Sequence, residues 1–325
     1  MGGSRNKPFP DLIARVGDFV ADRCAGDAPL CVGLSGGCDS VLLLALLGRL
    51  GWPAGISAIH VHHGLSPHAD AWAQFCHDYC RQLAVPLTVA RVSVDRSSGC
   101  GVEAAAREAR YAAFAAHLPT TCNLLLAQHR GDQAETVLFN LLRGSGVAGA
   151  AGMRNQRVWQ GRRILRPLLG VPRLEIEACA RELGLDWVDD ESNADTGFSR
   201  NFLRHRVLPE IAGRFPGAEA ALARAADNFR EAADLLDELA AADWQAVAVG
   251  DQARLSGLRT LSMARLKNLL RWRLQVLGWQ VPVADRLTEF ARQLLSAAPD
   301  RHPELSLPAG RMRLSRGRLA WLPKE

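Results

Sequence analysis

The stretch that decides the fold is Leu34–Ser40 (Leu-Ser-Gly-Gly-Cys-Asp-Ser), which directly follows the apolar run 29–34 and opens a predicted helix over 40–50. Its two adjacent glycines allow a tight turn in which several backbone N–H groups point into one concavity. Together with the helix N-terminus, these groups form an anion site. Ser35 and Ser40 add hydroxyl donors, and Asp39 is a ligand for a Mg²⁺ ion that bridges phosphate oxygens. The alternative is an ordinary strand-to-helix turn with Ser or Asp as the N-cap.

Outward from this loop, residues 28–127 alternate between short apolar runs and amphipathic segments. The runs at 29–34, 55–61, 86–94 and 123–127 predict strands, and the segments at 40–50, 69–83 and 102–117 predict helices. Strands that alternate with helices indicate an α/β fold with a parallel, doubly wound sheet. Ligands of such sheets bind beyond the carboxyl ends of the strands, which is where the glycine loop lies.

The second part of the chain has a different, mainly helical pattern. Segments 219–243, 258–277 and 284–297 each predict a helix, and the tail after residue 300 predicts short strands. The sequence therefore predicts a catalytic domain over residues 1–216 and a mainly helical, partly basic domain over residues 217–325. The basic positions of the second domain are Arg265, Lys267, Arg271, Arg273 and the tail, and we expect them to contact nucleic acid backbone.

Composition excludes several classes of protein. The chain has 325 residues, of which 48% are hydrophobic and 22% charged, as in ordinary globular proteins. No apolar run reaches the roughly 18 residues of a membrane helix. The eight cysteines include no Cys-x-x-Cys pair and no zinc-type spacing. We therefore expect a cytoplasmic protein with reduced thiols that contacts no membrane.

The basic residues are almost all arginine: only three of the 39 are lysine. One interpretation is a genome that favours Arg and Ala. The other is recognition of phosphates and bases, for which the planar guanidinium group is suited. Composition leaves both open.

Further motifs give the chain a family resemblance. The pattern Ser-Gly-Gly-x-Asp-Ser over 35–40 resembles the signature of the PP-loop ATP pyrophosphatases, which have the adenine nucleotide alpha hydrolase-like fold and cleave ATP between its α and β phosphates. Segments 60–65, 103–111, 127–146, 166–169 and 189–204 follow in the order of one member group, the tRNA(Ile)-lysidine synthetases. The resemblance covers about residues 28–210.

That resemblance implies a ligase that forms a carbon–nitrogen bond and modifies tRNA. Its substrates are isoleucine tRNA with the anticodon CAU, L-lysine and ATP, and its cofactor is Mg²⁺. Lysine is joined to C2 of the wobble cytidine through an adenylated cytidine, which gives lysidine, AMP and pyrophosphate. A homodimer is left open.

The fourth motif carries a pair of acids. Asp132, Glu135 and Thr136 lie at i, i+3 and i+4 of a predicted helix, hence on one face. Helix capping is the simpler interpretation, and a negative pocket for ammonium groups is the functional one. The resemblance implies that Asp132 recognises lysine and that Glu135 contacts the amine or the nucleotide. His129 is either a contact to adenine or a structural residue, as a lone histidine more often is.

The remaining candidates are arginines and histidines. Arg107 and Arg110 lie at i and i+3, where they are either solvated or bound to phosphates, and Tyr111 is expected in the core. The four histidines between 60 and 68 are expected to be site walls and not zinc ligands. The resemblance implies a second phosphate or cytidine clamp at Asn193, Arg200 and Arg204.

Three groups of residues are thus predicted. The ATP-binding group is Ser35, Gly36, Gly37, Cys38, Asp39, Ser40, His60, Arg110 and His129, with Asp39 also the Mg²⁺ ligand. The catalytic and lysine-binding group is Asp39, Arg107, Asp132 and Glu135. The clamp is Asn193, Arg200 and Arg204.

The sequence departs from the family at several points. Gly131 stands where many members have a second Asp, and Ser66 replaces an Arg that usually follows His-Gly-Leu. Longer members carry a further C-terminal module, before which we expect this chain to stop. Two alternatives remain: a PP-loop enzyme that thiolates cytidine, which would use Cys-x-x-Cys pairs, and a non-catalytic ATP- or RNA-binding protein.

Overall fold

The computed structural model describes residues 8–24, 26, 28–95, 101–191, 195–298 and 301–324. Contacts divide the chain into two compact units, Met1–Asn228 and Phe229–Glu325. This division lies within the long helix α10 (Ala218–Val247). The domain boundary predicted between residues 216 and 217 lies just before that helix and stays a prediction.

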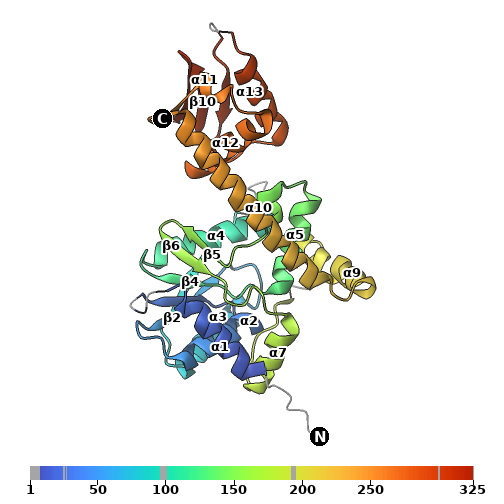
Figure 1. Cartoon of the computed structure of the whole chain (residues 1–325). Helices are drawn as coiled ribbons and strands as arrows, with labels where there is room; N and C mark the ends of the chain where they lie inside the picture. Colours follow the sequence, from blue (N-terminus) through green and yellow to red (C-terminus); the bar gives the residue numbers. More distant parts are fainter. Residues whose placement is uncertain are drawn as a thin grey trace. The chain divides into compact units, whose positions relative to one another are not determined.

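The first unit is built on a six-stranded sheet with the order β3-β2-β1-β4-β6-β5. Figure 1 labels β2, β4, β5 and β6 of this sheet. Its parallel strands are β1 (Leu30–Gly33), β2 (Ile56–His62), β3 (Leu87–Arg91), β4 (Asn123–Leu125) and β6 (Arg162–Leu165). The edge strand β5 (Gln156–Trp159) pairs with β6 in the antiparallel sense. The strand order reverses between β1 and β4, so the crevice for a ligand opens at the ends of these two strands. The predicted α/β fold is confirmed.

Helices cover both faces of this sheet. The helices α1 (Pro8–Ala21), α2 (Cys38–Leu50), α3 (Ala69–Gln82) and α7 (Arg173–Glu182) share one apolar core with alternate residues of the strands. On the other face, α4 (Val102–His117) packs Ala113 and Phe114 against Cys31, Leu124 and Ile164. In β1, Leu30 and Val32 face the first core while Cys31 faces the second, as the two-residue period of a strand requires.

The remaining elements of this unit gather around α5 (Arg130–Leu142), which follows β4. They are α6 (Val147–Ala150), α8 (Ser199–Phe202), the π-helical turn η2 (Leu203–Val207) and α9 (Leu208–Arg214). Of these, α6, α8 and η2 contact α5, and α9 contacts η2. Short π-helical turns are frequent at functional sites. η2 carries one of the predicted clamp residues, Arg204.

The second unit combines helices with a five-stranded antiparallel sheet of order β7-β8-β11-β10-β9. Its helices are α11 (Leu255–Leu258), α12 (Met263–Val276) and α13 (Ala284–Ser296), and its strands are β7 (Ala248–Val249), β8 (Gln252–Arg254), β9 (Glu304–Leu307), β10 (Gly310–Ser315) and β11 (Arg318–Pro323). The leucines of α12 and α13 pack on the inner face of this sheet. The predicted helical character and the predicted short strands of the tail are confirmed.

Two predictions about this unit need correction. The helix predicted to begin at residue 258 begins at Met263, because Ser262 caps α12 by accepting a hydrogen bond from the Arg265 N–H at 3.3 Å, while Leu258 is the last residue of α11. Arg273, expected to contact nucleic acid, is buried. Its guanidinium lies 4.3 Å from the centre of the Trp244 ring and bonds to Asp251.

In the part of the chain that the structure describes, no helix is both long enough and apolar enough to cross a membrane.

Candidate functional site

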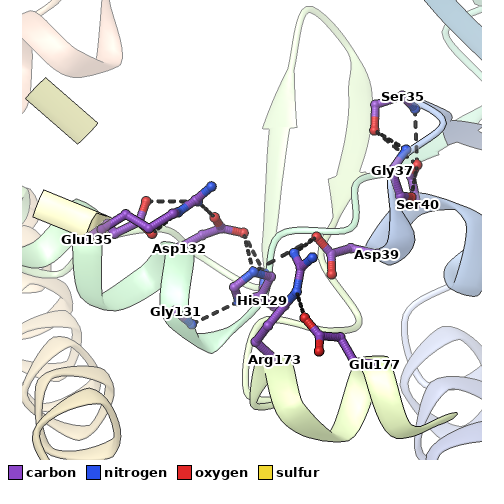
Figure 2. A network of polar contacts seen from close by, with 11 residues as sticks. Ser35, Gly37, Asp39, Ser40, His129, Gly131, Asp132, Glu135, Arg173 and Glu177 are labelled. Carbon is purple, nitrogen blue, oxygen red and sulfur yellow. Dashed lines mark hydrogen bonds and ion pairs between the residues drawn. The ribbon is translucent and has the colours of Figure 1, made fainter. Parts of the chain in front are cut away.

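The loop between β1 and α2 is held open by hydroxyl groups. The Ser40 hydroxyl accepts a hydrogen bond from the Ser35 N–H at 3.1 Å and donates to the Gly37 carbonyl at 3.0 Å. The Gly37 N–H in turn donates to the Ser35 hydroxyl at 3.3 Å (Figure 2). These bonds fix a wide turn in front of the α2 N-terminus, where an anion finds both N–H donors and the positive end of the helix dipole.

Gly36 is required by the backbone of this turn. Its φ is +91°, a region that residues with a side chain rarely adopt. A Cβ at this position would also lie 3.3 Å from the Cys76 Sγ, beneath the loop. The turn is therefore specified by glycine and by the packing of α3 behind it.

Asp39 lies in the first turn of α2 and is only partly paired. Its Oδ2 accepts a hydrogen bond from Arg173 Nη1 at 2.8 Å, while its Oδ1 is buried without a partner among the described residues. Burial raises the pKa of Asp39, although His129 and Arg173 counteract it. A buried carboxylate oxygen without a donor fits a cation ligand, which would satisfy it.

His129 connects Asp39 with the acidic helix α5. The ring Nδ1 accepts a hydrogen bond from the Gly131 backbone N–H at 3.0 Å. The backbone N–H of His129 donates to Asp132 Oδ2 at 3.0 Å, so the two bonds make a reciprocal helix cap. Since Nδ1 is an acceptor, the proton of the neutral ring resides on Nε2. Nε2 lies 3.9 Å from Asp39 Oδ2 and 3.7 Å from Asp132 Oδ2, and Figure 2 shows the ring between these two acids.

Asp132 and Glu135 share one cation. Arg204 Nε and Nη2 bond to the two oxygens of Glu135 at 2.6 and 3.0 Å, and Nη2 also bonds to Asp132 Oδ1 at 2.8 Å. Glu135 is only 3% exposed, and this burial raises its pKa even though Arg204 lowers it in part. A buried carboxylate and a partly buried one thus hold one guanidinium, an arrangement that suits a cation.

Two cavities of about 570 Å³ each adjoin these residues. The strand-end cavity lies beyond β1 and β2, and its lining includes Ser35, His60, Arg110, Phe114 and Leu126. The α5 cavity is lined by His129, Glu135, Arg173, Glu177 and Arg204, among others. Asp190 lines both. Each is within the usual size range of small-molecule sites.

The structure brings most of the predicted residues together, in two places. His60 faces the strand-end cavity with its Nδ1 bonded to the Leu34 carbonyl at 2.9 Å, and Arg110 lies in the same wall. His129 lines the α5 cavity and not the strand-end cavity, so its predicted contact with adenine stays a prediction.

The predicted clamp is not one cluster. Arg204 holds the two acids, whereas Arg200 pairs with Glu103 at 3.1 Å. Arg107 lies beside the Tyr111 ring, and Asn193 lies outside the described residues. Ser66, where the family usually has Arg, donates a hydrogen bond to Glu191 at the rim of the strand-end cavity.

Sequence reasoning missed the Arg173–Glu177 pair. Arg173 opens α7 and bonds both to Asp39 and, at 3.0 Å, to Glu177 one helical turn later. The i, i+4 spacing of opposite charges was visible in the sequence, but such pairs usually lie on a solvated face. Only the fold shows that this one reaches the phosphate loop.

The surroundings of Cys38 and Asp39 bear on two questions, whether the protein could thiolate cytidine and how it could hold a cation. Burial raises the pKa of the Cys38 thiol to about 12, with Asp39 adding to the effect, so this thiol is protonated at neutral pH and is a poor sulfur carrier. Among the described residues no group of three or more His, Cys, Asp or Glu side chains could hold a metal ion. A cation at Asp39 would therefore depend on oxygens from a bound phosphate, as Mg²⁺ commonly does.

Family models match most of the chain. A model for the PP-loop domain matches residues 10–211, and a model for the TilS substrate-binding domain matches residues 254–320. The first match contains the phosphate loop, α5 and both cavities up to their last few residues.

Curated relatives match nearly the whole chain. The tRNA(Ile)-lysidine synthase of Aromatoleum aromaticum is 48% identical over 90% of this chain and 68% of its own length. That of Pseudomonas aeruginosa is 46% identical over 91% of this chain and 69% of its own length. The chain thus spans about two thirds of these relatives.

Among solved structures, the fold is similar to that of a U34-tRNA thiolase, NcsA from Methanococcus maripaludis. The TM-score is 0.58 over 70% of this chain and 81% of the other, with 15% identity. At that identity the likeness concerns the fold alone.

Proposed function

The chain belongs to the tRNA(Ile)-lysidine synthase family, and from that premise we propose that it joins L-lysine to the wobble cytidine of isoleucine tRNA in an ATP-dependent reaction. The observation that carries the proposal is the proximity of a phosphate loop to a buried acidic pocket. Asp39 of the loop and Asp132 of the pocket both face the His129 Nε2, within 3.9 Å. The phosphate loop binds the ATP that activates the cytidine, and the acidic pocket holds the amine of lysine.

The first step is adenylation of the cytidine. The pyrophosphate end of ATP binds the N–H and hydroxyl donors of the loop, and the adenosine occupies the strand-end cavity beside Arg110. The C2 carbonyl oxygen of an unstacked cytosine attacks the α-phosphorus, and the bond from that phosphorus to pyrophosphate breaks. Positioning and charge neutralisation account for most of such a reaction.

The second step is attack by lysine. Asp132 and Glu135 attract the ammonium groups of lysine into the place that the Arg204 guanidinium fills. The free ε-amine attacks C2, the bond from C2 to its oxygen breaks, and AMP leaves with that oxygen. Glu135 is the acceptor for the proton of the amine, because its raised pKa makes it a stronger base than an exposed Glu.

Mg²⁺ fits the loop at Asp39, whose buried Oδ1 has no partner among the described residues. When bound there with phosphate oxygens it would neutralise negative charge. Arg173 and His129 orient the Asp39 carboxylate from its other side.

RNA recognition involves both family domains. A single-stranded anticodon loop exposes its bases at little cost, so the target cytosine reaches the strand-end cavity without disruption of a helix. L-lysine as the second substrate and a homodimer are further parts of the proposal. Thiolation of cytidine is disfavoured by the buried, protonated Cys38.

The test is transfer of labelled lysine to an unmodified isoleucine tRNA transcript with a CAU anticodon, in the presence of ATP and Mg²⁺. We expect transfer that requires both ATP and lysine and that falls about 100-fold or more in Asp39→Ala, since the phosphates lose a positioning group. Asp11→Ala, at an exposed acid of α1, is the matched control.

Release of AMP without labelled tRNA would retain the ATP chemistry and reject lysine as the substrate. Absence of AMP release under all conditions would instead favour a binding protein.

A further inference from the structure

Tyr111 of α4 is not an ordinary core residue. Its ring packs edge-on against Phe114 and Trp159, with centroid distances of 5.8 and 5.1 Å. The guanidinium carbons of Arg107 and Arg157 each lie 5.1 Å from the ring centre. The hydroxyl is buried and makes no hydrogen bond of ordinary geometry among the described residues, and Arg166 is its polar neighbour.

The arginines around this hydroxyl lack counter-charges. Neither Arg107 nor Arg157 forms an ion pair with a carboxylate among the described residues, and the buried Arg157 Nε has no acceptor there. Among the described residues Arg166 bonds to neutral groups, the Gln128 amide at 2.9 Å and the Arg154 carbonyl at 2.8 Å, and it also interacts with the Tyr111 hydroxyl.

The pKa values of Arg166 and Tyr111 are both shifted in the direction that nearby positive charge produces. Burial, together with Arg157 and Arg107, lowers the pKa of Arg166 to about 10, although Tyr111 acts in the opposite direction. Burial raises the pKa of Tyr111, but the nearby arginines outweigh it and bring that pKa below its usual value. An anion bound among these groups would relieve their repulsion and satisfy the unpartnered donors.

The cluster lies next to the strand-end cavity but does not line it. Phe114, which contacts Tyr111, and Arg110 belong to the cavity wall, whereas Tyr111, Arg107 and Arg157 do not. Arg157 pairs with Ile164 across β5 and β6, so it stands at the carboxyl end of the sheet. A nucleotide in the cavity with its phosphates on the glycine loop therefore leaves this cluster free for another anion.

We propose that Arg107, Tyr111 and Arg157 form a second phosphate site, which binds a backbone phosphodiester of the substrate RNA beside the base that reacts. Two guanidinium forks and one hydroxyl supply donors for the non-bridging oxygens. That the phosphate belongs to RNA rests on the proposed function, whereas the anion site itself rests on the geometry of the cluster.

The experiment measures tRNA binding to the full chain as a function of salt, for Arg157→Gln and Tyr111→Phe. Arg81→Gln, at an exposed arginine of α3, is the control with the same loss of charge. We expect Arg157→Gln to weaken binding about tenfold and to reduce the slope of log K against log salt by about 1, which corresponds to one lost phosphate contact. Tyr111→Phe should weaken binding several-fold, and the KM for ATP should not change in either variant.

The other outcomes are distinct. Unchanged tRNA binding with an unchanged unfolding temperature would make the cluster structural and overturn the inference. A raised KM for ATP with unchanged tRNA binding would assign the site to the nucleotide and also overturn it. If the wild-type chain transferred no lysine while Arg157→Gln still weakened RNA binding, the proposed function would fail and the phosphate site would stand.

Discussion

Asp132 has two roles, since one oxygen caps α5 and the other faces Arg204. Both roles use a carboxylate, but only the second depends on its charge. A substitution that keeps the acceptor and removes the charge therefore separates the structural contribution from the binding contribution.

For Asp132→Asn we expect a rise of about 10- to 100-fold in the KM for lysine, because a charge-assisted hydrogen bond contributes roughly 1.5–3 kcal/mol. The KM for ATP should be nearly unchanged, as the amide still caps the helix. Steady-state kinetics of lysine transfer measure both values. Asp70→Asn, at an exposed acid that pairs with Arg91, is the control. Transfer with the wild-type KM would rule out the lysine pocket.

We expect the stability of the folded protein to depend on pH through the ionisation of His63. Burial, with smaller effects of Arg110, His60 and His62, lowers its pKa to about 4, so the native state holds a neutral ring at neutral pH. The unfolded chain, with a pKa near 6.5, binds more protons between these values. The contribution of His63 to stability is therefore complete above about pH 6.5 and is lost as the pH falls towards 4.

Thermal unfolding of wild type and His63→Asn between pH 4 and 8 measures this effect. The difference between the two should be constant above about pH 7 and should move against the wild type at lower pH. Other groups, such as His60, remain in both proteins and cancel. A difference that does not vary with pH would contradict the assignment.

At the scale of elements, the N-terminus of α5 explains the glycine at position 131. A Cβ there would lie 2.8 Å from His129 Cε1 and 3.1 Å from Nδ1. The imidazole ring is 5% exposed and holds the helix cap, so it has little freedom to move. In this chain the His129 ring fills the space that a side chain at position 131 would need, and Asp132 is the acid of the first turn.

Gly131→Ala should therefore displace the His129 ring and remove the cap. We expect a loss of about 1 kcal/mol in the free energy of unfolding, typical of a lost N-cap, together with slower lysine transfer. Gly170→Ala, at a glycine with open space around its Cα, is the control. Equal stability of the two variants, measured by urea unfolding, would show that the ring adapts.

The elements also show what the sequence could and could not predict. The strands and helices between 28 and 127 follow from apolar period and turn residues, which are local signals. The β5–β6 pair was not predicted, because its short, arginine-rich strands have no apolar alternation. The ion pair from Arg173 to Asp39 depends on the packing of α7 beside α2, and no local pattern encodes that contact.

At the scale of the whole molecule, basic side chains recur on the sheet of the second unit. Arg311, Arg313 and Arg318 are exposed on the β10–β11 pair, while Met312, Leu314 and Leu319 face the core. Among the residues that the structure describes, Glu304 offers partial neutralisation, at 3.9 Å from Arg311 and 3.7 Å from Arg313. Such a face suits an RNA backbone.

The double variant Arg313→Gln/Arg318→Gln should weaken tRNA binding and reduce the salt slope by up to about 2, without a change in the KM for ATP. Arg292→Gln is the control, because Arg292 is exposed but already bonded to both oxygens of Glu289. Filter binding at several salt concentrations provides the measurement. A salt slope equal to that of the wild type would exclude this face from the RNA contact.

Arg204 already occupies the pocket that Asp132 and Glu135 form, so a cationic substrate binds there by exchange with its guanidinium. Arg204 offsets one of the two carboxylate charges before any substrate arrives, so under the proposed function an incoming lysine replaces one cation by another and adds no net charge to this region. The affinity for lysine is then the difference between two similar interactions and should depend only weakly on ionic strength. A free amine that offers one ammonium group and nothing more has little advantage over the arginine already in place. The selectivity of this pocket among amines therefore depends on how each amine competes with Arg204 for the two carboxylates.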